Sequence, residues 1–296
     1  MFQVFVDSGA NIPAVIVKEY GIHVISFTNT VNGEPLVCFN PDLTPEQERE
    51  EGHKYYEAIA AGAEVKTSLI NSATYEEAFR PYLEQGEDIL CFSISHGISG
   101  CNNAARIAME ELSEEFPDRK LRLVDSLNAS LAEGILGIYA VEMRDKGEDI
   151  DTIADRLQEW AHKMNGVFTV EDLKYLARTG RVSNMTAFVG NMLSIKPMLK
   201  GSKDAVIVVF KKVRSRKKSL NELIDIVVNN IVDPEEQIIG IAHADCYEDS
   251  LYIMEKIQEK VKVRRFINTS YDYCTGSHVG PGTVALFFMG KDRELV

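Results

Sequence analysis

The chain has 296 residues and a mass of 33.1 kDa, and 45% of its residues are apolar, which suits about two globular domains with a large buried core. Its 32 Lys and Arg against 45 Asp and Glu give a formal net charge of −13, which argues against broad attraction to nucleic acid or anionic lipid. The five cysteines form no CxxC pair, and no apolar run is long enough for a membrane span. We therefore expect a cytoplasmic protein without disulfides or signal peptide.

The first half of the chain alternates short apolar runs with amphipathic segments. A hairpin turn is predicted at Asn32-Gly33, and Thr44, Pro45 and Gln47 form a capping box with proline at the first helical position. This repetition of strand, loop and helix predicts a parallel sheet covered by helices on both faces. The expected strands are 2–6, 22–27, 88–94 and 121–125, and the expected helices are 13–20, one starting at 44, 74–86 and 101–116.

The second half has a different pattern, with strand-like runs lying close together. A turn is expected at 200–202, between two of these runs. We therefore divide the chain into an N-terminal α/β domain, residues 1–163, and a smaller α+β C-terminal domain, residues 164–296. The expected strands are 193–199, 205–213, 238–242, 263–268 and 283–289, and the expected helices are 170–178, 220–231 and 249–260.

The segment from Ser95 to Gly100 connects a predicted buried strand to the start of a helix. In open parallel sheets ligands bind at this edge, and a helix start offers free N–H groups to an anion. Ser99 either caps the helix or gives its hydroxyl to a ligand. The sequence does not match a nucleophile elbow at Ser95 or Ser99, because neither serine has glycine both two residues before it and two residues after it.

Two further segments carry candidate ligand-binding side chains. Thr67 and Ser68 place adjacent hydroxyls on a predicted loop, where they either bind a carboxylate or phosphate or are ordinary turn residues. His278 is crowded by glycines within 276–282, so its imidazole either serves a ligand or is structural. No histidine pair or carboxylate has the spacing of metal ligands, so no metal site is expected.

Basic residues are concentrated at two places. Arg181 follows a predicted helix and its C-cap glycine, where it either binds an anion or ties down the helix end. The block 211–218 contains six Lys or Arg residues in a chain of strongly negative charge. It is either a solvated strand end or a docking surface for an acidic protein partner.

Taken together and in order, these motifs resemble those of the DegV family, and the resemblance runs through essentially the whole chain. The segments that carry it are Asp7–Pro13 (D-S-T-x-D-L-P in the family), Thr67–Leu69 (T-S-Q), His96–Cys101 (S-x-L-S-G-T), Thr179–Ser183 (G-G-R-I-S), Ile195–Leu199 (I-K-P-I-L), Val213–Lys218 (V-R-T-R-K-K) and His278–Gly282 (H-x-G-P-G).

The resemblance implies a DegV-like fold of two α/β domains with a long-chain fatty acid such as palmitate in an apolar tunnel between them. By motif, Thr67 and Ser99 bind its carboxylate and His278 lies near the headgroup. We expect Ser68, Ser95, His96 and Gly100 to complete this ligand-binding end. Family members need no cofactor and present the fatty acid to a separate ATP-dependent kinase, which forms the acyl-phosphate, and Arg214 matches an arginine implicated in contacting that kinase.

Five residues depart from the family motifs, and two other functions remain open. Gly9 and Asn11 replace a hydroxyl residue and an acid in the first motif. Leu69, His96 and Cys101 replace Gln, Ser and Thr, and His96 is a candidate for a proton-dependent contact with the carboxylate. The alternative function is a serine hydrolase or acyltransferase that uses Ser99 or Ser95 with His96 or His278. A third is a regulatory module that binds a protein partner through the basic block.

Overall fold

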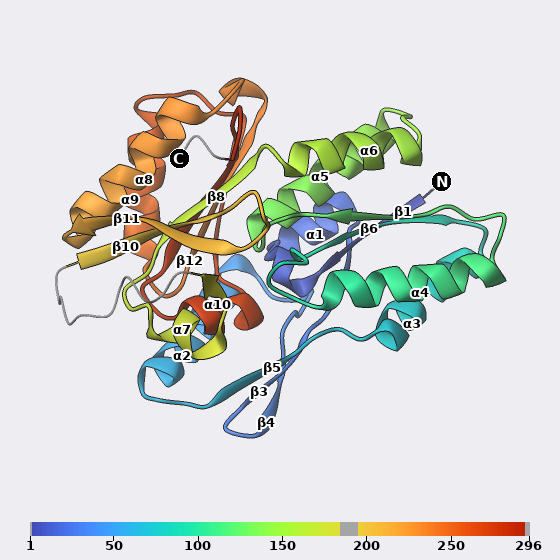
Figure 1. Cartoon of the computed structure of the whole chain (residues 1–296), viewed down its shortest axis with the longest axis horizontal. Helices are drawn as coiled ribbons and strands as arrows, with labels where there is room; N and C mark the ends of the chain where they lie inside the picture. Colours follow the sequence, from blue (N-terminus) through green and yellow to red (C-terminus); the bar gives the residue numbers. More distant parts are fainter. Residues whose placement is uncertain (1, 184–194, 294–296) are drawn as a thin grey trace.

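The computed structural model describes residues 2–183 and 195–293 of the chain. Figure 1 shows the two large sheets lying on either side of the molecule, with helix α5 between them and a small three-stranded sheet extending to one side. This arrangement confirms the predicted mixed α/β architecture, with one wholly parallel sheet and a separate mixed sheet.

The first sheet is parallel throughout, and its side chains alternate between two helical layers. Val4 and Val6 of β1 join the core under α5, whereas Phe5 between them joins the core under α3 and α4. This period of two is what a strand buried on both faces requires. In spatial order the strands are β2 (His23–Ile25), β1 (Phe2–Asp7), β6 (Asp88–Ser93) and β7 (Leu121–Asp125), and the helices are α1 (Ala14–Tyr20), α3 (Ser72–Glu84), α4 (Cys101–Glu115), α5 (Leu131–Asp145) and α6 (Ile150–Ala161).

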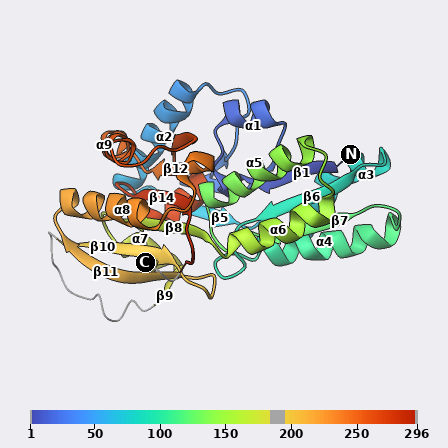
Figure 2. The same cartoon turned by 90° about the horizontal axis from the view of Figure 1, so that it is seen from above.

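The second sheet has seven strands of mixed direction. Helices α8 and α9 pack on one face, and the other face contacts α5 through β8, β12 and β14 (Figure 2). In spatial order its strands are β13 (Arg265–Ser270), β12 (Ile238–His243), β14 (Val284–Met289), β8 (Met164–Thr169), β10 (Ile195–Gly201), β11 (Ile207–Arg214) and β9 (Val182–Ser183), and its helices are α7 (Lys174–Thr179), α8 (Arg216–Asn230), α9 (Tyr247–Gln258) and α10 (Tyr273–Val279).

The small sheet is built from β4 (Glu34–Val37), β3 (Thr28–Val31) and β5 (Val65–Ser68) in that order. The predicted hairpin at Asn32-Gly33 connects β3 and β4, and both turn residues have positive φ, as a tight hairpin requires. The predicted capping box starts α2 (Pro45–Ala60), where Thr44 and Gln47 bond reciprocally. A strand partner for β3 then comes from β5, on the far side of α2 in sequence.

Several sequence predictions need correction. Thr67 and Ser68 lie in strand β5, because β3 offers an edge that pairs with them, and not in a loop. The helix expected at 74–86 begins at Ser72, because Asn71 caps it by accepting from the Thr74 N–H. The turn expected at 200–202 lies at 202–206, because β10 extends to Gly201.

Other expectations are matched only in part or are not tested. His278 lies in the short helix α10, although glycine-rich sequence around it predicted a loop. The first two residues of the strand expected at 193–199 lie outside the described residues. No element was assigned to 126–160, where the structure has α5 and α6. The domain boundary between residues 163 and 164 stays a prediction. Among the described residues, no helix combines the length and apolar character of a membrane span.

Candidate ligand-binding site

A cavity of about 270 Å³ lies between the two large sheets. Its walls come from the loops after β6 and β7, from β5, from α7 and α10, and from strands of the second sheet. The volume far exceeds the roughly 10–15 Å³ that one water molecule needs. The position agrees with the rule that ligands bind at the carboxyl ends of parallel strands.

The body of the cavity is apolar. Side chains from both halves of the chain form it, among them Ile94, Leu127, Phe168, Leu176 and Phe287. Phe168 and Phe287 come from neighbouring strands β8 and β14 of the second sheet, whereas Ile94 and Leu127 follow strands of the first. Such a wall offers an alkyl chain dispersion contacts and removes it from water.

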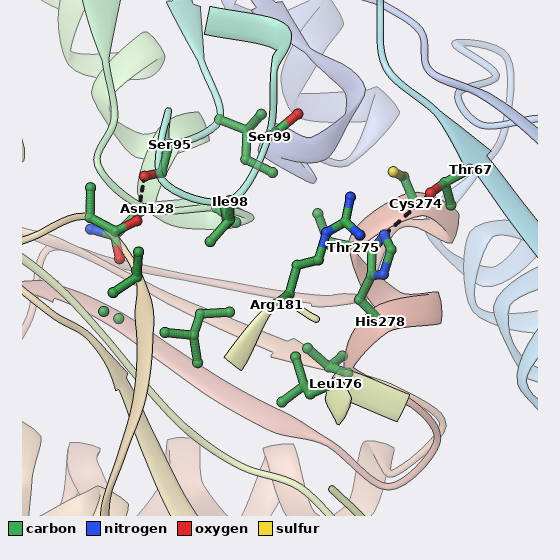
Figure 3. Close-up of a pocket in the computed structure, with 18 of the residues that line it drawn as sticks. Thr67, Ser95, Ile98, Ser99, Asn128, Leu176, Arg181, Cys274, Thr275 and His278 are labelled. Atoms are coloured by element: carbon green, nitrogen blue, oxygen red, sulfur yellow. Dashed lines mark hydrogen bonds between the residues drawn. The ribbon is translucent and has the colours of Figure 1, made fainter. Parts of the chain in front are cut away.

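Polar side chains gather at one part of the cavity wall. Thr67, half-buried in β5, places its Oγ1 atom 3.3 Å from Nε2 of His278 in α10. Figure 3 shows these two side chains pointing toward one another. Ser68 beside Thr67 also lines the cavity and is exposed, so this part of the wall reaches the surface. The structure thus brings the predicted residues Thr67, Ser68 and His278 together.

The imidazole of His278 is held in its neutral form. Burial lowers its pKa to about 4, and the nearby positive charges of Arg181 and Arg178 act in the same direction. Nδ1 of the ring is buried and has no hydrogen-bond partner among the described residues. A neutral ring with one unpaired nitrogen can therefore donate to or accept from a ligand without burying a charge.

Ser99 and Gly100 lie at the start of α4, as predicted, and both line the cavity. The N-cap residue is Gly100, and the Ser99 hydroxyl accepts a hydrogen bond from the Cys101 N–H at 3.3 Å. The structure thus shows the bond of Ser99 to the helix start, and a hydroxyl that accepts from the helix still has its proton to donate. An anion at this place would also face the N–H groups of the helix start.

Ser95 lines the cavity but uses its hydroxyl within the protein. It is fully buried, donates to the carbonyl oxygen of Ala205 at 2.7 Å and accepts from the Gly97 N–H at 3.2 Å. The first of these bonds connects the loop after β6 to the turn between β10 and β11. In Figure 3, Ser95 lies on the opposite side of the cavity from Thr67 and His278.

His96 and Arg214 are placed away from the polar part of the wall. His96 is not among the residues that line the cavity: its Nδ1 lies 2.5 Å from Oδ2 of Asp125, and 59% of its side chain is exposed. Arg214 is the exposed last residue of β11, next to the start of α8. The proposed carboxylate contact of His96 has no support from this geometry, because the ring turns to Asp125.

The geometry gives little support to a serine hydrolase. Neither Ser95 nor Ser99 has a hydrogen bond to a histidine among the described residues, and the hydroxyl that reaches His278 belongs to Thr67. A serine nucleophile needs a base within hydrogen-bond reach. The hydroxyls of Ser95 and Ser99 instead form hydrogen bonds with backbone groups.

Of the residues that line the cavity, Arg181 was a ligand contact in only one of two alternatives in the sequence analysis, and Asn128 and Thr275 were not identified. Arg181, for which an anion contact was one of two readings, lines the cavity. Asn128 and Thr275 line it as well and were missed. Asn128 follows the β7 strand, so the rule about strand ends could have identified it, whereas Thr275 depends on how α10 packs.

Comparison with known proteins gives consistent results over the whole chain. The family model described as "Uncharacterised protein, DegV family" matches residues 1–291. A DegV domain-containing protein of Clostridium perfringens is 38% identical over 294 residues, which cover 99% of each chain. Similar solved structures include a DegV lipid binding protein from Thermotoga maritima (27% identity, TM-score 0.82, covering 99% of this chain and 100% of that one) and a fatty acid binding DegV family protein from Streptococcus agalactiae (28%, 0.83, 99% of each). The chain belongs to the DegV family.

Proposed function

We propose that this protein binds a long-chain fatty acid, with the acyl chain in the cavity and the carboxylate at the Thr67, Ser99 and His278 end. The observation that carries the proposal is an apolar cavity with hydrogen-bonding groups at one end, where the neutral Thr67 and His278 lie near the positive charge of Arg181. Two relatives above 25% identity are described as lipid binding and fatty acid binding. The reading of these residues therefore agrees with what those proteins bind.

The energetics suit such a ligand. Moving a C16 chain out of water is worth about 0.8 kcal/mol per methylene, roughly 12 kcal/mol before the costs of association and ordering. Tight binding then needs no buried ion pair. The carboxylate still needs donors once water is excluded, and hydroxyls with helix N–H groups supply them.

We propose further that the bound acid is presented to a partner kinase and that the protein itself does no chemistry. A carboxylate oxygen would attack the γ-phosphorus of ATP on the partner, giving acyl-phosphate and ADP. The exposed positions of Ser68 and Gly100 support access to the carboxyl end, and exposed Arg214 within the basic block supports a partner surface. A cytoplasmic location goes with this proposal.

The test begins with organic extraction of the purified protein and mass spectrometry for bound lipid, followed by palmitate titration of the delipidated protein. Replacing Thr67 by Val together with Ser99 by Ala should weaken palmitate binding roughly a hundred-fold or more, because each of the two hydrogen bonds to a charged group contributes about 1.5–3 kcal/mol. Ser113→Ala is the matched control, since that α4 hydroxyl bonds the Met109 carbonyl away from the cavity.

The outcomes separate the proposed functions. Absence of bound lipid combined with no palmitate binding by the delipidated protein would refute fatty-acid binding. Turnover of an activated ester that is lost in Ser99→Ala would favour the hydrolase instead. For the kinase role, Arg214→Ala should leave palmitate affinity unchanged and reduce acyl-phosphate formation by an added fatty acid kinase.

A further inference from the structure

Asn29 is a buried amide in the middle of β3 whose side chain has no partner. The residue is 1% exposed, and neither Nδ2 nor Oδ1 has a hydrogen bond among the described residues. Buried amides in folded proteins are almost always paired, because leaving both atoms unpaired costs more than folding can easily offset. An orphan of this kind indicates a partner that comes from outside the chain.

The register of the small sheet places this amide beside the polar part of the cavity. Asn29 lies directly opposite Thr67 in the antiparallel pair of β3 and β5. Opposite residues in such a pair project to the same face, with their Cβ atoms about 4.5–5.5 Å apart. Thr67 lines the cavity, as does Phe27, two residues before Asn29 on the alternating strand face. Asn29 therefore lies on the same face of the small sheet as Thr67 and next to it, although it is not itself among the residues that line the cavity.

A second unpaired group lies in this region. Thr67 is hydrogen-bonded to Nε2 of His278, and Nδ1 of that ring is also buried without a partner among the described residues. Three polar atoms without partners thus belong to two side chains adjoining Thr67. Among the described residues, the outer face of β3 has no such orphan, since Thr28 and Thr30 are exposed or half-buried.

We propose that Asn29 is a further headgroup-binding residue, whose Nδ2 donates a hydrogen bond to the carboxylate of the bound fatty acid beside Thr67. This inference rests on the proposed function and extends it. A carboxylate accepts strong hydrogen bonds from N–H donors. The side-chain amide of asparagine is such a donor and carries no charge. In the empty protein the amide has no hydrogen-bond partner. Its N–H donor is therefore already in place when the ligand binds.

The experiment uses Asn29→Leu, which keeps the branched skeleton of the side chain and replaces both polar atoms by methyl groups. Because the amide is unpaired in the empty protein, this substitution should raise the thermal midpoint of the delipidated protein by about 2 °C or more, while weakening palmitate binding on the order of ten-fold or more. Asn29→Val, which suits a strand, gives a second version of the same test. Thr30→Val, on the other face of β3, should change neither quantity strongly.

A raised thermal midpoint together with weaker palmitate binding would support the inference, because a purely structural role of Asn29 does not produce both changes. If Asn29 were satisfied by a permanently bound water, both Asn29 variants would lower the thermal midpoint and leave palmitate affinity unchanged, which would overturn the inference. Unchanged affinity with a raised midpoint would overturn it as well. Failure of the wild-type protein to bind palmitate would instead refute the proposed function, so the two failures are distinguishable.

Discussion

Asp7 and Glu133 form a buried carboxyl pair directly behind the cavity. Asp7 accepts hydrogen bonds from the N–H groups of Gly9 and Ile94, and Oε1 of Glu133 accepts from the Asp7 N–H at 3.1 Å. Burial raises the pKa of Asp7 to about 7, and burial together with the charge of Asp7 raises the pKa of Glu133 well above its ordinary value. Because Ile94 lines the cavity, the proton state of this pair bears on one wall of the site.

Glu133→Gln should therefore change how stability depends on pH. The native protein holds a proton on Glu133 that the unfolded chain releases above its ordinary pKa, so stability falls as the pH rises toward the native pKa. The substituted amide cannot lose a proton in this way and still offers an oxygen to the Asp7 N–H. The thermal midpoint of the variant minus that of the wild type should grow as the pH rises above the ordinary glutamate pKa of 4.5 toward the raised native pKa.

Circular dichroism melts at three pH values measure this difference. Asp7 contributes a further loss of stability from about pH 4 to 7 in both proteins, so the comparison isolates Glu133. Glu142→Gln on the same helix is the control, because Glu142 pairs with Arg264 near the surface. A difference that stays constant with pH would contradict the assignment of a proton to Glu133.

At this scale the sequence predicted the motif residues better than their partners. Thr67, Ser99 and His278 were identified and all line the cavity, and their roles in ligand binding stay predictions. Asn29 was not identified, because its position beside Thr67 follows from the pairing of β3 with β5. Helix α2 separates these two strands in the sequence, so the pairing cannot be seen locally. His96 was assigned to the ligand, but Asp125 at the end of the neighbouring strand takes its ring.

Helix α10 shows how packing decides an element that local sequence does not. Gly276 within it and the segment 280–282 (Gly-Pro-Gly) after it predict a loop, yet Asp272 caps a helix by accepting from the N–H groups of Cys274 and Thr275. Tyr56 of α2 lies against Gly276 and bonds the carbonyl of Tyr271 at 3.0 Å. Contacts from α2 thus hold the helix that carries His278.

Gly276→Ala should displace α10 from this position. A Cβ atom at residue 276 would lie 1.9 Å from the Tyr56 hydroxyl, so helix or tyrosine must move. We expect a loss of about 1–3 kcal/mol in the free energy of unfolding and weaker palmitate binding, because His278 moves with the helix. Denaturant titration and ligand displacement measure the two effects.

A double-mutant cycle with Tyr56→Phe tests the cause. Removing the hydroxyl costs the bond to Tyr271 but also removes the nearest clash, so the combined loss should be smaller than the sum of the single losses. Additive losses would show that Gly276 acts through something other than this contact.

Elements that begin or turn at a short sequence motif were predicted correctly. The hairpin at Asn32-Gly33 and the capping box at Thr44 were both found. Helix α5 was not predicted because it is buried on almost all sides between the two sheets, so its sequence lacks the polar stripe of a surface helix. Helix α6 had a usable signal in its Asp149 cap, and that signal was not recognised.

The two large sheets share one apolar core. Val4 and Val6 of the first sheet and Phe168 and Ala285 of the second belong to the same continuous cluster, with α5 between them. The cavity is likewise lined by residues of both sheets. Unfolding either half alone would expose this shared surface to water and open the cavity.

Palmitate should therefore stabilise the molecule as a unit. We expect the delipidated protein to unfold in a single calorimetric transition, and palmitate at a free concentration of about 100 times its Kd to add about 2.7 kcal/mol, which raises the whole transition by several degrees. Octanoate has the same carboxylate but eight fewer methylenes, worth roughly 6 kcal/mol of transfer free energy, so at equal concentration it should give no shift. Two separate transitions, of which palmitate moved only one, would mean that the ligand contacts a single domain and that the shared core does not couple the two sheets.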